Sequence, residues 1–147
     1  MKITYIKLLI ILFITSMGCK DSASNNKDVF AKGIETLYTR QHLAKLTGVI
    51  IIPGEGCGNC INDASLYCLA HQEVQQQYGI IFTGVKDKKT LKIQFKEPFF
   101  LNPNVVIDTD NYFMKDSISS IYPQIVLLEN SEIKSVDLFS SEKVILK

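Results

Sequence analysis

The sequence predicts a single domain of the α/β class. Strand-like segments alternate along the chain with segments whose apolar residues recur at helical spacing, which is typical of a sheet covered by helices. The apolar, β-branched run 48–52 suits a strand that is buried on both faces. Two strand-like segments near the C-terminus are separated by a short turn sequence, which predicts a hairpin. A length of 147 residues allows one such domain.

The first 18 residues have the pattern of a signal peptide. Lys2 and Lys7 precede the apolar run 8–14, and small residues follow that run, as in secretory signals. The stretch 8–18 has 11 residues, whereas a membrane-spanning helix needs roughly 20. We therefore expect an exported protein, in a compartment where cysteine pairs can be oxidised.

Cys19 is the expected lipid attachment site. The residues 16–19, Ser-Met-Gly-Cys, resemble the lipobox of bacterial lipoproteins, although Ser16 stands where a Leu is usual. The resemblance implies a lipid anchor in the bacterial cell envelope, periplasm-facing or at the outer membrane. Residues 19–28 are polar and would form a tether, so that the folded domain covers 29–147. A plain cleaved signal with Cys19 as a bystander is the alternative.

The charge balance argues against a nucleic-acid partner. The whole chain has a formal net charge of +1, and without Lys2 and Lys7 it has 14 basic and 15 acidic residues. A nucleic-acid-binding domain would carry a clear basic stripe. We expect a monomer that contacts the membrane through its lipid anchor.

The first half of the domain should contain two helices and two strands. Apolar spacing predicts an interrupted helix over 29–46, a strand over 48–52, a helix from Cys57 to Tyr78 and a strand over 80–85. Gly79 is expected to be the C-terminal glycine of the second helix.

The second half should end in the hairpin. We expect a helix centred within 86–96 and ended by Pro98, a strand over 105–107 that ends at Asp108, a helix over 110–120, and strands over 124–128 and 133–138. Asn130 suits the turn between the last two strands, since Asn tolerates positive φ.

The dithiol Cys57-Gly58-Asn59-Cys60 is the expected working centre. It follows a buried strand and a Gly-rich turn, and it opens a helix. Unpaired backbone N–H groups and the helix dipole at that position stabilise negative charge. The pKa of a cysteine placed there falls, and the thiolate is the species that attacks. Two intervening residues bring the second sulfur within disulfide reach of the first.

The segments 50–60 and 122–133 together resemble the thioredoxin superfamily, and more narrowly its membrane-tethered thiol-disulfide oxidoreductases. This resemblance covers 48–138. It implies a three-layer α/β/α sandwich with a central mixed sheet and a C-terminal β-hairpin. The stretch between Gly84 and Val105 would then be an insertion that contains an extra helix.

The resemblance also implies roles for individual residues. Cys57 would attack a disulfide of an exported protein that has a cysteine pair, and Cys60 would resolve the mixed disulfide. Tyr122 and Pro123 would border the substrate groove, with Pro123 in the cis form and facing the dithiol. Glu55 is a candidate proton relay, and a solvated loop residue is the alternative reading. No cofactor is implied.

This sequence departs from the family pattern at positions that matter for exchange. Gly56 stands where an aromatic residue usually precedes the dithiol, and Ile51 stands where many members bury an acid. These departures leave open a non-catalytic adaptor, or a module that delivers a soft ion such as Cu(I) through the cysteine pair. A peroxidase that uses one cysteine alone is a third reading.

The remaining cysteine and the histidines point to no metal site. Cys68 lies eight residues after Cys60, roughly 12 Å along a helix, which is beyond disulfide reach. We expect it to be a small buried hydrophobe. His71 is expected to be partly buried and His42 exposed. Two scattered histidines and one CxxC make a closed zinc site improbable.

Overall fold

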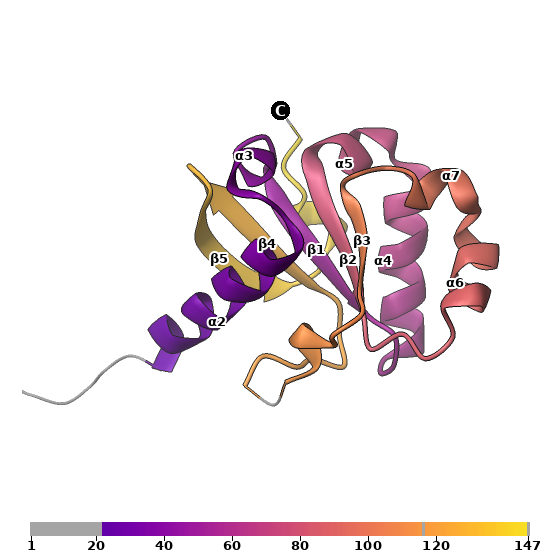
Figure 1. Ribbon diagram of the computed structural model, residues 1–147, viewed down its shortest axis with the longest axis horizontal. Helices are drawn as coiled ribbons and strands as arrows, with labels where there is room; N and C mark the ends of the chain where they lie inside the picture. The colour runs from indigo at the N-terminus through magenta and orange to yellow at the C-terminus, as the bar shows by residue number, and fades with distance from the viewer. Residues whose placement is uncertain (1–21, 116, 147) are drawn as a thin grey trace, which may run out of the picture.

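The computed structural model describes residues 22–115 and 117–146, so the expected signal peptide and Cys19 lie outside the described residues. Five strands form one mixed sheet in the order β3-β2-β1-β4-β5 (Figure 1). The strands are β1 (Gly48–Pro53), β2 (Tyr78–Thr83), β3 (Val105–Asp108), β4 (Gln124–Glu129) and β5 (Glu132–Leu138). β2 pairs in parallel with β1 and β3, whereas β4 is antiparallel to both β1 and β5.

Helices cover both faces of this sheet (Figure 1). One face carries α2 (Ser22–Leu37), α3 (Arg40–Leu43) and the 3-10 turn η1 (Tyr112–Met114). The other carries α4 (Gly58–Ala70), α5 (Gln72–Gln77), α6 (Lys88–Phe95) and α7 (Glu97–Phe100). A second 3-10 turn, η2 (Ser141–Lys143), follows β5. None of the helices in the described chain is long and apolar enough to cross a membrane.

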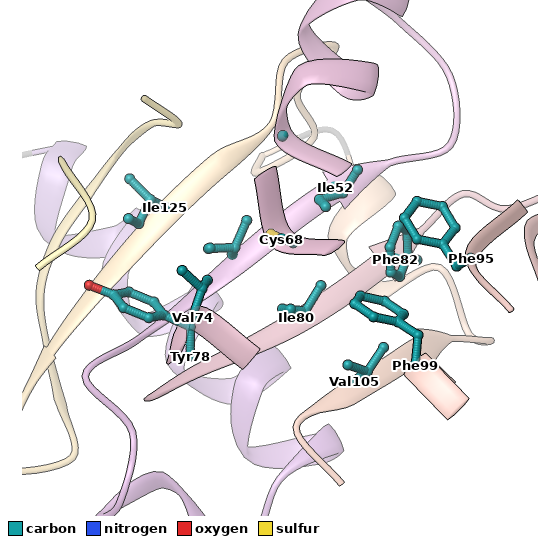
Figure 2. Close-up of a cluster of buried hydrophobic side chains, with 12 residues drawn as sticks. Ile52, Cys68, Val74, Tyr78, Ile80, Phe82, Phe95, Phe99, Val105 and Ile125 are labelled. Carbon is teal, nitrogen blue, oxygen red and sulfur yellow. The ribbon is translucent and has the colours of Figure 1, made fainter. Parts of the chain in front are cut away.

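The α/β class is confirmed by the way β1 is buried. Ile50 and Ile52 point to the α4 side, and Val49 and Ile51 point to the α2 side. All four side chains are at most 2% exposed, because a strand in the middle of a helix-covered sheet alternates between two cores. Figure 2 shows the core on the α4 side, to which Cys68 of α4, Phe82 of β2 and Phe95 of α6 contribute together with Ile52.

The terminal hairpin is also confirmed. Asn130 and Ser131 form the two-residue turn between β4 and β5, with φ of 53° and 68°. Two positive φ values give a turn whose twist matches that of the strands it joins. Asn tolerates this conformation because its side chain is short and polar.

The first expected helix is two helices, and α2 begins at Ser22. The described part of the expected tether, residues 22–28, is therefore helical. At Lys27 the ammonium donates to the carbonyl oxygen of Lys134 at 3.0 Å, which connects this part of α2 to β5.

Gly79 was wrongly expected to end the helix that follows the dithiol. That helix ends at His71, whose φ of −110° and ψ of 98° separate α4 from α5. Tyr78 already belongs to β2, where it is fully buried and pairs with Gly48. Gly79 is inside the strand, where a Cβ atom would lie 3.0 Å from the Tyr38 hydroxyl.

The expected helix over 110–120 was also wrong, because η1 is a single 3-10 turn. Asn111 has a φ of 50°, and Phe113 donates its N–H to the Asp108 carboxylate at 3.1 Å. Pro98 does not end α6 but lies in the first turn of α7. The break between these two helices is Lys96, with a φ of 62°.

The C-terminal segment is hydrogen-bonded to the first residue of β2. The Tyr78 hydroxyl donates to the carbonyl oxygen of Ile145 at 3.0 Å and accepts from the N–H of Ile145 at 2.8 Å. The neighbouring side chain of Val144 packs against the core on the α4 side.

Candidate redox site

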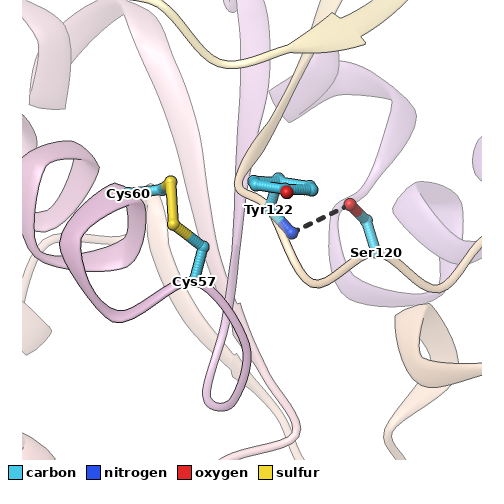
Figure 3. Close-up of a disulfide and its surroundings, with 4 residues drawn as sticks. All are labelled: Cys57, Cys60, Ser120 and Tyr122. Carbon is cyan, nitrogen blue, oxygen red and sulfur yellow. Dashed lines mark hydrogen bonds between the residues drawn. A yellow bond between two sulfur atoms is a disulfide. The ribbon is translucent and has the colours of Figure 1, made fainter.

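Cys57 and Cys60 form a disulfide, with 5.3 Å between their Cα atoms. Cys57 is the N-cap residue of α4, and Cys60 lies in its first turn. Both cysteines are half-buried, whereas Gly58 and Asn59 between them are exposed. The sequence therefore placed the pair correctly, at the start of a helix that follows a buried strand (Figure 3).

Two glycines allow the turn between β1 and α4 to pass close to its neighbours. The N–H of Gly54 donates to the carbonyl oxygen of Thr83 at 2.7 Å, and a Cβ atom at Gly54 would lie 2.5 Å from the carbonyl oxygen of Gly84. Gly56 has a φ of 139°, and a Cβ atom there would lie 2.2 Å from the carbonyl oxygen of Ile121. An aromatic side chain before the dithiol has no room in this packing, which accounts for the glycine at 56.

The segment before β4 lies beside the disulfide. Cys57 donates its N–H to the carbonyl oxygen of Ile121 at 2.9 Å. The next residue, Tyr122, is 43% exposed and its ring lies across from the two sulfurs (Figure 3). Its N–H donates to the Ser120 hydroxyl at 3.0 Å. The structure thus brings Cys57 and Cys60 close to Tyr122, which the sequence resemblance predicts at the border of the substrate groove.

Pro123 is buried, and the peptide bond that precedes it is trans, so the expected cis form was wrong. The trans form is the usual state of X–Pro bonds. Pro123 lies directly before β4, where a residue without an N–H leaves no ladder hydrogen bond unmade. Its carbonyl oxygen accepts from the N–H of Phe139 at 2.9 Å, which holds this segment against the end of β5.

The first turn of α4 offers donors to a thiolate. The first hydrogen bond of the helix runs from the Ile61 N–H to the Cys57 carbonyl oxygen, at 2.9 Å. The Cys57 side chain makes no capping hydrogen bond. Backbone N–H groups in the first turn of a helix have no acceptor within the helix, and a cysteine thiol at such a position has a lowered pKa.

Position 51, where many family members have an acid, and the candidate proton relay Glu55 have different surroundings. Ile51, at the position of the missing acid, is buried in the core on the α2 side. Glu55 is half-exposed and forms an ion pair with the mostly exposed Lys86. The Glu55 carboxylate is thus engaged on the surface of the turn.

A buried carboxylate was missed by the sequence analysis. Asp108, the last residue of β3, is 2% exposed. Its Oδ2 accepts from the Thr83 hydroxyl at 2.7 Å and from the Phe113 N–H at 3.1 Å, and its Oδ1 has no partner in the described chain. The only signal in the sequence was an acid at the end of a predicted strand.

Cys68 is fully buried, as expected. Burial raises the pKa of its thiol to about 12, so that Cys68 stays protonated and unreactive at neutral pH. It lies on the same helix as the disulfide but takes no part in it.

The histidines make hydrogen bonds with protein groups. His71 is half-buried as expected, with Nδ1 at 2.9 Å from the Tyr67 carbonyl oxygen. His42 was expected to be exposed but is half-buried, and its Nε2 lies 2.7 Å from the Asn104 side-chain oxygen. Within residues 22–115 and 117–146, no group of three or more His, Cys, Asp and Glu side chains is arranged to hold a metal ion.

Two hollows flank the disulfide. A groove of about 510 Å³ lies between α4 and α6 and reaches Gly54 and Gly58. A hollow of about 400 Å³ lies on the other side and includes Cys60, Tyr67 and Phe139. A partner that reaches the sulfurs would therefore meet concave surface on either side.

Comparison of the chain with protein-family models, with curated proteins and with solved structures finds no significant match.

Proposed function

We propose that this protein is a thiol-disulfide oxidoreductase with a thioredoxin-like fold, which acts on exported proteins that have cysteine pairs. The observation that carries the proposal is the half-buried Cys57–Cys60 disulfide at the first turn of α4, directly after a buried parallel strand. The α/β/α layering and the terminal hairpin support the fold.

Exchange would proceed through a mixed disulfide. In the reduced protein the Cys57 thiolate attacks one sulfur of the partner's disulfide, and the other partner sulfur leaves as a thiolate that takes a proton from solvent. Cys60 then loses its proton to solvent, and its sulfur attacks Cys57. This step restores the Cys57–Cys60 disulfide and releases the second partner sulfur, so that two electrons have passed to the partner. The oxidised form seen in the structure is the starting point of the reverse reaction.

Tyr122 and Pro123 would form one wall of the partner groove. The Tyr122 ring lies across from the disulfide (Figure 3), and the Cys57–Ile121 hydrogen bond fixes its distance from α4. We also propose that Cys19 carries the lipid anchor in the cell envelope, with the domain acting there as a monomer. Radiolabelled palmitate incorporation that is lost in Cys19→Ala tests the anchor.

The exchange is tested by insulin reduction with stoichiometric amounts of the soluble domain, which is reduced beforehand and freed of reductant. Wild-type protein and Cys68→Ser should both reduce insulin, and Cys57→Ser should have no activity. Cys60→Ser should accumulate a mixed disulfide, because no second thiol resolves it. Equal activity in Cys57→Ser and wild type would refute the proposal.

The same variants separate the alternatives. A tight Cu(I) complex that needs both cysteines, together with no insulin reduction, would identify a copper-delivery module. Peroxide consumption that survives Cys60→Ser would identify a peroxidase with a single reactive cysteine.

A further inference from the structure

The largely buried Ser65 lines a groove between α4 and α6. The groove is lined by one face of α4 that consists of Gly58, Ile61, Asn62 and Ser65, spaced at i, i+3, i+4 and i+7. Ser65 is 3% exposed, and its side chain makes no hydrogen bond to any residue that the structure describes. Solvent reaches the Ser65 hydroxyl oxygen. Among the described residues, Asp108 Oδ1 is the one polar side-chain atom that solvent does not reach and that has no hydrogen bond.

The rest of the groove is mainly apolar at its base and polar at its rim. Ile52, Phe82 and Phe95 belong to the core below it, and Leu91 of α6 forms part of its wall. Gln94 lies at the outer edge of the same wall and is exposed. A volume of about 510 Å³ is within the range of binding pockets, which combine apolar walls with a few polar groups that fix orientation.

The groove is continuous with the redox site. Gly58, which lines it, lies between the two cysteines. Ser65 is eight residues beyond Cys57, about 12 Å along the axis of the helix. An extended peptide covers that length in about three to four residues. A partner that is covalently joined to the Cys57 sulfur therefore has its neighbouring residues within reach of the groove.

We propose that this groove binds an aromatic side chain with a polar tip, Tyr above all, from the partner protein near its exchanging cysteine. The ring packs on Ile52, Phe82 and Leu91, and the phenolic hydroxyl pairs with the Ser65 hydroxyl. Water can reach the Ser65 hydroxyl while the groove is empty, and an apolar ligand that covers it removes that hydrogen bond without replacing it, which costs free energy. A ligand that pairs with the hydroxyl is therefore favoured over an otherwise equal apolar one. The groove would thus make the proposed exchange reaction prefer partners with such a side chain. The kinetic test of this inference rests on the proposed oxidoreductase function.

The kinetic test uses disulfide peptides with Tyr, Phe or Ala placed three or four residues from the cysteine, with dithiothreitol as the reductant that regenerates the dithiol. For wild-type protein, KM should rise about 5-fold from Tyr to Phe and again from Phe to Ala. In Ser65→Ala the Tyr and Phe peptides should become equal, while Ala remains worse. Thr36→Ala, at an exposed hydroxyl of α2 on the opposite face of the sheet, should keep the wild-type order. Exchange without any preference for Tyr would overturn the inference and leave the proposed function standing.

A direct binding test does not depend on exchange. In NMR titrations of the full soluble domain, 4-methylphenol should shift the amide signals of Ser65, Leu91 and Gln94 at lower concentration than toluene does. Ser65→Ala should remove this difference. Absence of shifts at these amides would refute the groove as a binding site. Shifts without a Tyr preference in the peptides would identify a small-molecule site and refute the partner side chain as its occupant.

Discussion

The backbone N–H of Cys57 donates a 2.9 Å hydrogen bond to the carbonyl oxygen of Ile121. This bond joins two segments that are far apart in the sequence, the turn before α4 and the loop before β4. It sets the position of the Tyr122 ring relative to the disulfide (Figure 3). Any change that separates the two segments should therefore affect stability and exchange together.

Gly56→Ala should break this arrangement. A Cβ atom at Gly56 would lie 2.2 Å from the Ile121 carbonyl oxygen, and the φ of 139° is unfavourable for alanine. We expect a loss of about 3 kcal/mol in unfolding free energy, measured by urea denaturation. Gly58→Ala is the matched control, because its Cβ atom has no neighbour within 4 Å. It should change stability by less than about 0.5 kcal/mol, and equal losses in both variants would contradict the packing argument.

Asp108→Ala should destabilise the edge of the sheet. It removes the acceptor of the Thr83 hydroxyl and of the Phe113 N–H, and unsatisfied buried donors are costly. We expect a loss of about 2 to 4 kcal/mol in urea denaturation. Asp108→Asn keeps one acceptor oxygen and should lose less than half as much. The hydrogen-bond account fails if the two variants are equally unstable.

Cys68 should make stability depend on alkaline pH. Its pKa is raised to about 12 in the folded state, compared with about 8.5 to 9 in an unfolded chain. Between these values the folded protein binds more protons than the unfolded chain, so unfolding free energy falls as pH rises, by up to about 1.4 kcal/mol per pH unit. The contribution is complete below pH 8. In the disulfide form of Cys68→Ala, the unfolding free energy should decrease less steeply from pH 9 to 11 than in the wild-type protein. An unchanged slope would contradict the raised pKa of Cys68.

Glu55→Gln should have little effect. The carboxylate is half-exposed and paired with the exposed Lys86, and pairs of this kind contribute little to stability. We expect less than a twofold change in insulin reduction at every pH from 6 to 9. A lost pH dependence in Glu55→Gln, with Lys86→Gln unchanged, would instead support the proton-relay role.

The strands and the dithiol were predictable because their signals are local. The run 48–52 is apolar at every position, which suits a strand buried on both faces, and Asn130 suits the turn that it occupies. The CxxC after a Gly-rich turn predicted the disulfide at the start of α4.

The errors arose where strand pairing, burial or a side-chain hydrogen bond overrides the local apolar pattern. Gly79 is typical of a helix end, yet Tyr78 is drawn into β2 by pairing with Gly48 and by burial. The residues after Asp108 have helical spacing, but the carboxylate of Asp108 takes the Phe113 N–H and holds a 3-10 turn. The Ser65 groove was not visible in the sequence either, since it exists only where α6 packs beside α4.

The attachment of Ile145 to the Tyr78 hydroxyl has a consequence for synthesis. Tyr78 is the first residue of β2, whereas Ile145 is synthesised 67 residues later. While the ribosome still encloses residues 144 and 145, the hydroxyl of Tyr78 has neither of these bonds, and Val144 has not yet covered its part of the core. This side of the protein therefore closes only after these two residues have left the exit tunnel.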